Sequence, residues 1–227
     1  MKKSISYLII LFACVNSAIA ATSGNLRDTV SLKSIFRDHK LIDNPKAFKI
    51  LSPNSISLTA GKETDFYTFI DGRYYTNNAP KFLFTPDSNF IFTARLKPDF
   101  KETYDGGGIL IYADGENWAK LLFENNDGNK PGLGTSVVKN KMTDDSYSDE
   151  IKNKDVYVKI AKAGNVFCFY SSFDGKAWNL NRTFSFPKTA TMRIGFYSQS
   201  PKGSECTVEF SDITYRAKAF KNFFTGE

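Results

Sequence analysis

The sequence predicts an antiparallel all-β domain, either a sandwich or a barrel, and three observations lead to that prediction. From about residue 47 onward, short segments such as 89–96 (NFIFTARL) and 155–162 (DVYVKIAK) alternate with the period of two that a β-strand requires. Turn-forming pairs such as Asp114-Gly115 separate these segments at regular intervals. No long segment between 47 and 216 has a convincing helical period.

The first twenty residues have the features of a secretory signal peptide. A basic pair at 2–3 precedes an apolar run (7–15) that is too short to span a bilayer, and 18–20 (AIA) has the small-x-small pattern of a cleavage site. The alternatives are an uncleaved anchor helix and a lipid attached at Cys14, where the match to a lipobox is loose. We therefore expect an exported protein, periplasmic or extracellular, whose mature chain has no transmembrane segment.

The rest of the chain divides into three parts. Residues 21–44 form an N-terminal segment, in which 32–42 (LKSIFRDHKLI) is expected to be a short helix. Residues 45–216 contain the alternating segments and are expected to form one domain with a substantial core. Residues 217–227 are expected to be a C-terminal tail.

The two tryptophans of the chain, Trp118 and Trp178, each come three residues after an Asp-Gly pair. A two-residue hairpin turn of the primed kind needs positive φ, and Asp-Gly adopts it at little cost. We therefore predict hairpin turns at Asp114-Gly115 and Asp174-Gly175. The glycines of 106–108 are expected to form a flexible strand entry, since no Gly-Lys-Ser/Thr follows to make a phosphate-binding loop.

Strand parity assigns two faces to each segment. In 118–124 (WAKLLFE), Ala119, Leu121 and Phe123 form a core face, whereas the opposite face carries aromatic and charged residues. This second face is either an ordinary solvated surface with cross-strand pairs or a shallow concave surface for sugars. In the second case aromatic rings cover a pyranose and polar side chains bind its hydroxyls. The candidate binding residues are Asp65, Tyr67, Trp118, Lys120, Glu124, Tyr157, Arg193, Tyr197 and Gln199.

Several kinds of chemistry are disfavoured. His39 is the only histidine and lies upstream of the predicted domain, so a Ser-His-Asp or Cys-His centre is not expected. Clusters of His and Cys that would hold zinc are missing from the sequence, and no cofactor is expected. The acidic run 144–150 is a calcium candidate, but it lacks the spacing of a recognised loop and is better interpreted as solvated.

Charge and cysteine positions give two further expectations. The formal net charge of +6 is spread along the chain without a Lys/Arg-rich block, so nucleic acid is not an expected partner. Cys168 and Cys206 lie in strand-like segments, where parity places Cys206 with the core and Cys168 on the opposite side from its core neighbours. A disulfide needs facing Cβ atoms, so we expect two unpaired thiols.

Four motifs carry a resemblance to a known family. They are 62–72 (KETDFYTFIDG), 104–124 (YDGGGILIYADGENWAKLLFE), 155–178 (DVYVKIAKAGNVFCFYSSFDGKAW) and 193–215, in this order. They resemble the uncharacterised family of concanavalin A-like jelly rolls that includes the fungal regulation-of-enolase protein. The chain is more distantly similar to the sugar-binding sandwich appended to some β-xylosidases. The resemblance covers 45–216 and implies a concanavalin A-like jelly-roll sandwich.

The resemblance also bears on particular residues. The family's Thr-Asp-Phe-aromatic motif falls on 64–67, where Tyr67 replaces the more usual Trp, and its Asn-Trp-x-Lys…Glu motif falls on 117–124. A further motif, Ser-x-Asp-Gly-x-x-Trp, falls on 172–178. The catalytic jelly-roll glucanases carry Glu-x-Asp-x-x-Glu, whereas the nearest stretch here ends in Thr68. That activity is therefore not implied for this chain.

The function expected from the sequence is an exported, non-catalytic, lectin-like domain whose partner is a glycan or oligosaccharide. One alternative is a glycoside hydrolase-like enzyme that uses Glu124 and Asp65, since two suitably spaced carboxylates suffice for that chemistry. Another is a protein-interaction domain of the envelope. Trp118 shares a face with Lys120 and Glu124 and is expected at the site, whereas Trp178 is expected to be packing or lid material.

Overall fold

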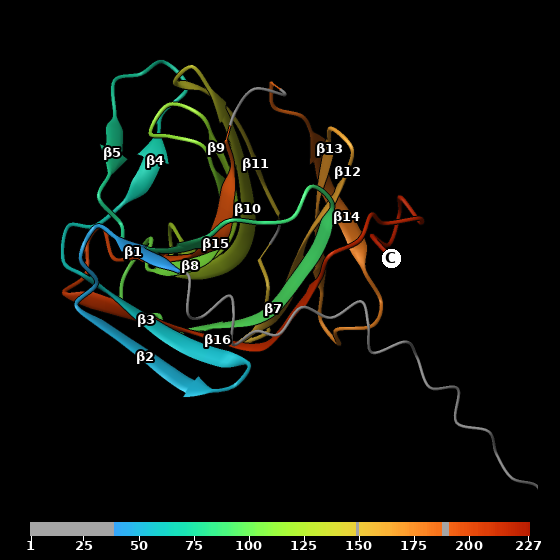
Figure 1. The fold of residues 1–227 in the computed structure, drawn as a ribbon. Helices are drawn as coiled ribbons and strands as arrows, with labels where there is room; N and C mark the ends of the chain where they lie inside the picture. The colour runs from blue at the N-terminus through green and yellow to red at the C-terminus, as the bar shows by residue number, and fades with distance from the viewer. Residues whose placement is uncertain (1–38, 149, 188–190) are drawn as a thin grey trace, which may run out of the picture.

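The computed structural model describes residues 39–148, 150–187 and 191–227 and shows two seven-stranded antiparallel sheets packed face to face (Figure 1). The predicted antiparallel sandwich is therefore confirmed. The proposed signal peptide, with Cys14, lies outside the described residues. Within the described ranges, no helix is long and apolar enough to cross a membrane.

We call the first sheet the front sheet. Its strands, in spatial order, are β1 (Lys40–Ile42), β6 (Lys81–Phe84), β15 (Arg193–Gln199), β8 (Gly106–Tyr112), β9 (Trp118–Asn126), β10 (Lys130–Lys139) and β11 (Met142–Tyr147). The front sheet curves around a separate hairpin, β4 (Phe66–Thr68) and β5 (Tyr75–Asn77) (Figure 1).

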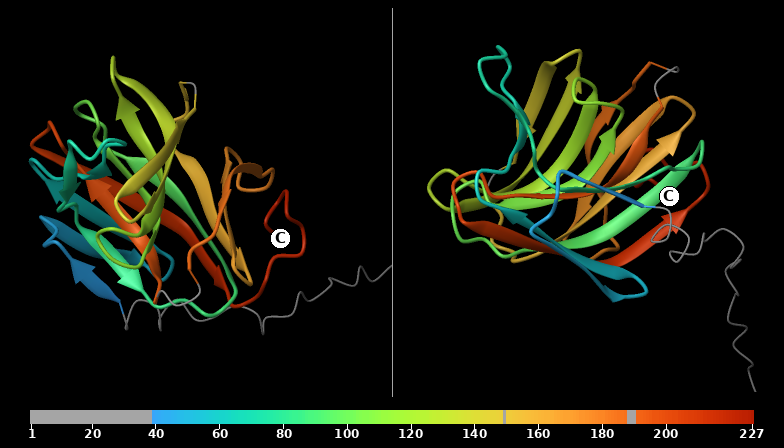
Figure 2. Two further views of the ribbon diagram at one scale, coloured as in Figure 1. Left: turned by 90° about the horizontal axis from the view of Figure 1, so that it is seen from above. Right: turned by 60° about the vertical axis from the view of Figure 1, so that its left-hand side comes forward.

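The second sheet, the back sheet, lies on the other side of the core. Its spatial order is β14 (Asn179–Phe184), β13 (Val166–Ser172), β12 (Val156–Ala163), β7 (Phe90–Pro98), β16 (Glu205–Arg216), β3 (Ser55–Gly61) and β2 (Ala47–Ser52). The C-terminal tail (217–227) lies beside β12 and β13 (Figure 2), where Tyr170 Oη donates a hydrogen bond of 2.7 Å to the Phe223 carbonyl.

The central core contains the residues that strand parity placed there. Leu121 and Phe123 of β9 and Phe196 of β15 face the back sheet, where Phe92 and Phe210 meet them. The ring centroids of Phe196 lie 5.1 Å from Phe92 and 4.3 Å from Phe210. Burial of such large apolar side chains is the main source of stability in a sandwich.

Two smaller buried clusters cover the outer faces of the sheets. The hairpin β4–β5 covers part of the front sheet, where Phe66 packs on Trp118 and Tyr197. The tail covers part of the back sheet, where Phe220 and Trp178 pack against a buried group of four residues: Ile91, Ala161, Cys168 and Tyr170. Cys168 is thus separated from Cys206, which lies in the central core, and both cysteines are free, as expected.

The predicted two-residue turns are wrong, but the recurrent aspartate has a clear role. β8 ends at Tyr112 and β9 begins at Trp118, and the β13–β14 connection is similarly long. Gly175 has a positive φ of 70°, whereas Gly115 is not among the described glycines with positive φ. Instead, Asp114 and Asp174 each accept a backbone N–H two residues ahead at 2.8 Å. This is the Asx turn, in which a side chain replaces a backbone acceptor.

Three other local expectations are corrected by the structure. Lys40–Ile42 of the predicted helix 32–42 form strand β1, and 32–38 lie outside the described residues. The glycines of 106–108 lie in the strand β8 rather than in a flexible entry. Glycine is required at 108, because a Cβ there would lie 2.1 Å from the Leu121 carbonyl oxygen of the neighbouring strand. The acidic run contributes to strand β11 rather than to a solvated loop.

Candidate functional site

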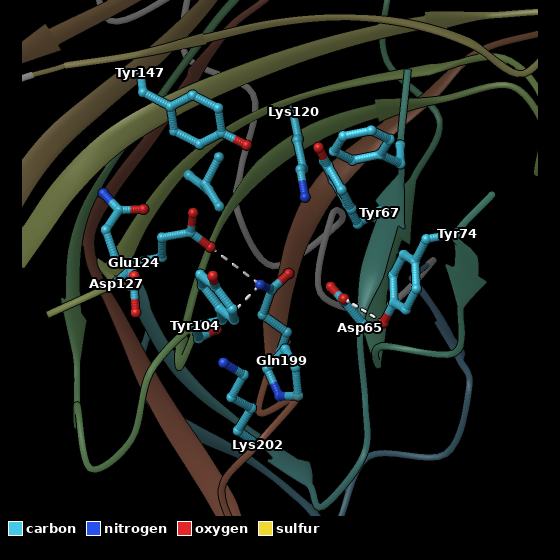
Figure 3. Close-up of a pocket in the computed structure, with 14 residues that line it drawn as sticks. Asp65, Tyr67, Tyr74, Tyr104, Lys120, Glu124, Asp127, Tyr147, Gln199 and Lys202 are labelled. Atoms are coloured by element: carbon cyan, nitrogen blue, oxygen red, sulfur yellow. Dashed lines mark hydrogen bonds between the residues drawn. The ribbon is translucent and has the colours of Figure 1, made fainter. Parts of the chain in front are cut away.

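A cavity of about 750 Å³ lies between the front sheet and the hairpin β4–β5 (Figure 3). Its size falls in the range of small-molecule sites. Strands β4, β9, β11 and β15 and the loops beside them supply its walls. The lining residues are Asp65, Tyr67, Phe69, Tyr74, Tyr104, Lys120, Leu122, Glu124, Asn126, Asp127, Tyr147, Gln199, Pro201 and Lys202.

Lys120 is the buried cation of the pocket. Its position on β9 alternates with the core residues, so its side chain points to the outer face and under the hairpin, where it is only 2% exposed. The ammonium donates a hydrogen bond to the Phe66 carbonyl and lies 5.4 Å from the ring centroid of Tyr67. Burial lowers the pKa of Lys120, while the carboxylates of Asp65 and Glu124 act in the opposite direction.

Glu124 lies four residues further along the same face of β9 and is also buried. Burial raises its pKa to about 7, an effect that Lys120 opposes and Asp65 reinforces. The Gln199 side chain holds this carboxylate, since its Nε2 donates to Glu124 Oε2 at 3.3 Å and to the Tyr104 carbonyl at 3.1 Å. Glu124 is therefore poised to change its charge near neutral pH.

Asp65 approaches from the opposite side, as the residue immediately before β4 (Figure 3). Its carboxylate accepts the backbone N–H of Phe66 at 2.7 Å and the hydroxyl of Tyr74 at 2.9 Å. Burial raises the pKa of Asp65, while the ammonium of Lys120 lowers it. Lys120, Glu124 and Asp65, which we call the floor of the pocket, therefore affect one another's pKa values across it.

Several polar atoms of this region have hydrogen-bonding capacity to spare. Among the described residues, the buried Oε1 of Gln199 and the hydroxyl of Tyr197 have no hydrogen-bond partner. The ammonium of Lys120 has three N–H groups, and one of them is engaged by the Phe66 carbonyl. Buried polar atoms without partners are costly, so a ligand that binds Gln199 Oε1 and the remaining N–H groups of Lys120 in the pocket gains affinity.

Tyrosines form the walls around this polar floor. Tyr67 and Tyr74 come from the hairpin side, and Tyr147 from the end of β11 (Figure 3). Tyr67 donates to Asp145 Oδ2 at 3.1 Å, and burial raises the pKa of Tyr67 to about 12. Tyr104 has a φ of 69°, in the left-handed region that bulky residues avoid, and the ammonium of Lys202 lies 4.6 Å from its ring centroid. Such outliers cluster at functional sites.

Of the predicted site residues, the structure brings five together in this pocket: Asp65, Tyr67, Lys120, Glu124 and Gln199. The other four do not line it. Trp118 and Tyr197 share the same face but are buried beneath Phe66, with the Trp118 and Phe66 ring centroids 4.1 Å apart. Arg193 pairs with Tyr112 at the far end of β15. Tyr157 belongs to the back sheet, where it donates to Asp212 at 3.0 Å.

Sequence reasoning did not name nine further lining residues: Leu122 and Asn126 on β9, Tyr147 at the end of β11, and, in connecting segments, Phe69, Tyr74, Tyr104, Asp127, Pro201 and Lys202. Leu122 had a signal, because it alternates in phase with Lys120 and Glu124, and so did Tyr74, which comes two residues after the turn pair Asp71-Gly72. Across the described parts of the chain, no group of three or more His, Cys, Asp or Glu side chains is placed to hold a metal ion.

Comparisons with known proteins agree on the family and the fold. The model of the family described as "Protein of unknown function (DUF1349)" matches residues 41–218, which confirms the predicted family. A functionally unknown protein from Saccharomyces cerevisiae superposes with a TM-score of 0.73 at 22% identity, over 83% of this chain and 99% of the yeast chain. No curated protein matches the chain.

Two further solved structures share the jelly-roll-type sandwich. A GH43 protein from Bacillus licheniformis gives a TM-score of 0.61 at 15% identity, over 84% of this chain but only 38% of that longer chain. The CBM2 module of the evolved Dit of Lactobacillus casei BL23 phage J-1 gives a TM-score of 0.52 at 12% identity, over 82% of this chain and 92% of the module. Likeness at these identities establishes the fold alone.

Proposed function

The chain belongs to the DUF1349 family, and we propose that it is an exported domain that binds a glycan in the pocket of the front sheet without cleaving it. The observation that carries this proposal is the convergence of buried Lys120, Glu124 and Gln199 on one cavity walled by tyrosines. The signal-peptide features of residues 1–20 support export.

The chemistry of the pocket suits a sugar. Each sugar hydroxyl is both a donor and an acceptor, and the pocket offers donors from Lys120 beside acceptors from Glu124, Asp65 and Gln199 Oε1. The rings of Tyr67 and Tyr147 offer apolar faces to the C–H surface of a pyranose. Positive and negative groups alternate over a small floor, which suits a hydroxyl-rich ligand better than a strongly charged one.

The fold neighbours are consistent with this proposal. The GH43 protein and the CBM2 module bear names of carbohydrate-active proteins. Because the fold supports many functions, the residues of the pocket give the stronger support.

A second candidate is hydrolysis of a glycosidic bond, and the observation that favours it is the pKa of Glu124. A carboxyl with a pKa of about 7 keeps its proton in a substantial fraction of the molecules near neutral pH, and that protonated form can act as a general acid. Asp65 would be its partner across the pocket. This activity predicts release of sugar from the bound glycan and loss of that release in Glu124→Gln.

Titration of residues 21–227 against a broad glycan panel, by array and then by calorimetry, tests the proposal. We expect binding of at least one glycan class, weakened at least about tenfold in Lys120→Met, because hydrogen bonds to charged groups contribute about 1.5–3 kcal/mol. Lys139→Met, at an exposed position of the neighbouring strand β10, is the matched control and should bind normally. Calorimetric titrations that show no binding to any glycan of the panel would overturn the proposal. Capture of a stable protein partner without a glycan would favour an envelope interaction domain.

A further inference from the structure

We propose that the pocket receives the end of a glycan chain, so that one terminal sugar occupies the floor and the chain leaves through the open side. This inference rests on the proposed function and adds the way in which the ligand is recognised. Its basis is that the channel along the outer face of β9 is closed at one end.

The closed end is the Trp118 end of β9. The outer face of this strand presents Trp118, Lys120, Leu122 and Glu124 in sequence. Trp118 is 1% exposed because Phe66 of the hairpin lies over it. Lys120 marks the boundary, since its ammonium binds the Phe66 carbonyl while its side chain lines the pocket. The lining of the pocket includes Lys120 but not Trp118, so the pocket ends at Lys120 on this side.

One edge of the hairpin is fixed to β11. The Thr143 hydroxyl donates to the Thr68 carbonyl at 2.7 Å, and the Tyr67 hydroxyl donates to Asp145 at 3.1 Å. These two hydrogen bonds join strand β4 to the edge strand of the front sheet, so the hairpin closes that side of the channel.

The other edge of the hairpin is fixed to the region where β8 passes into β9. The Tyr75 hydroxyl donates to the Gly115 carbonyl at 3.2 Å, and Asn77 Nδ2 donates to the Tyr112 hydroxyl at 3.3 Å. The hairpin is therefore anchored on both sides, and a polymer lying across the front sheet has no passage beneath it.

The opposite end of the pocket is open. It is formed by the loop after β9, with Asp127, and by the loop after β15, with Pro201 and Lys202. Asp127 and Lys202 are exposed, whereas Lys120 and Glu124 are buried. In Figure 3, Lys120 and Gln199 point into the centre of the pocket, and Lys202 lies at its lower margin. The chain of a bound glycan would leave over these loops.

The polar groups at the closed end favour a terminal sugar over an internal one. A terminal sugar has a free hydroxyl at the position where an internal sugar carries its next neighbour. That hydroxyl can accept from the Lys120 ammonium and donate to the carboxylate of Glu124 or Asp65. An internal sugar has no hydroxyl at that position to accept from the remaining N–H groups of Lys120, and sites built to bind a hydroxyl strongly reject ligands that lack it.

The test uses a glycan that binds the wild-type protein, in three forms: open oligosaccharides of two to six units, the same chain with its terminal sugar O-methylated, and a cyclic oligosaccharide of the same sugar. By calorimetry we expect the affinity per chain to stay within about threefold from two to six units. End-blocking or cyclisation should weaken binding at least about tenfold.

Lys120→Met provides the matched variant, with circular dichroism confirming its fold. Because the partner of the terminal hydroxyl is removed, end-blocking should change the affinity of this variant less than about threefold. The effects of the mutation and of end-blocking on affinity should therefore be non-additive. An affinity that grows with every added sugar, or a cyclic glycan that binds as tightly as the open chain, would overturn end recognition while leaving glycan binding intact. A protein that binds no form of any glycan would overturn the proposed function itself.

Discussion

Glu124 and Lys120 share the outer face of strand β9, and the two buried groups affect each other's ionisation. Burial raises the pKa of Glu124 to about 7, although the ammonium of Lys120 acts against this shift. Burial lowers the pKa of Lys120, and the carboxylate of Glu124 acts against that change in turn. The pocket floor is therefore an electrostatically linked unit.

The first prediction concerns stability and pH. The folded-state pKa of Glu124 lies above its ordinary value of 4.5, so between about 4.5 and 7 the folded protein keeps a proton that the unfolded chain has released. The free energy of unfolding should fall as pH rises through this window, and this contribution should be flat outside it. Urea unfolding of wild type and Glu124→Gln should show a smaller fall in the variant, whereas exposed Glu150→Gln should match wild type. An identical slope in wild type and Glu124→Gln would contradict the buried environment of Glu124.

The second prediction concerns the link between the two groups. Lys120→Met removes the cation that lowers the pKa of Glu124, so this pKa should rise above about 7. A carboxyl ¹³C NMR titration measures it directly, and Lys139→Met should leave the midpoint unchanged. A midpoint that stays the same or falls in Lys120→Met would show that the two groups do not interact in the folded protein.

The third prediction separates the two tryptophans. Trp118 is fully buried under Phe66, so Trp118→Ala should lower the free energy of unfolding by about 3–5 kcal/mol. Trp178 is only partly buried and packs beside Lys159, whose ammonium lies 4.0 Å from its ring centroid. Trp178→Ala should therefore cost less, about 1–2 kcal/mol. Urea denaturation measures both variants, and equal losses would be inconsistent with the different burial of the two rings.

The fourth prediction concerns the glycines of β8. A Cβ on Gly108 would lie 2.1 Å from the Leu121 carbonyl oxygen, which is backbone and cannot move aside cheaply. Gly108→Ala should therefore cost about 1–3 kcal/mol. Gly61→Ala is the control, since a Cβ there meets no atom within 4 Å. Thermal unfolding compares the two, and a Gly108→Ala protein as stable as the control would show that β8 and β9 are not packed this closely.

Strand parity predicted much of the sandwich, because burial on one side forces alternation. It placed Leu121 and Phe123 in the core and Lys120 and Glu124 on the opposite face, as the structure shows. Strand parity does not show which other segment of the chain covers a given face of a sheet. Trp118 shares the face of Lys120, yet the hairpin buries it by packing Phe66 onto it.

The sequence pattern also did not predict which sheet each strand joins or where the connecting loops lie. Tyr157 has the same local pattern as a front-sheet residue, but long-range pairing places β12 in the back sheet. Tyr104 and Tyr147 reach the pocket only because segments distant in sequence meet there. No local period encodes that meeting, since it depends on strand order.

The central claim is that a glycan binds on the floor of this pocket, and NMR mapping of the bound ligand tests it most directly. With ¹⁵N-labelled protein, addition of the glycan selected by the array should shift the side-chain amide signal of Gln199 and the backbone signals of Lys120 and Glu124. The signals of Tyr157 in the back sheet and of Trp178 in the β13–β14 connection should stay unchanged. Saturating shifts confined to the back sheet, or a glycan panel that shifts no signal of the pocket, would contradict the claim.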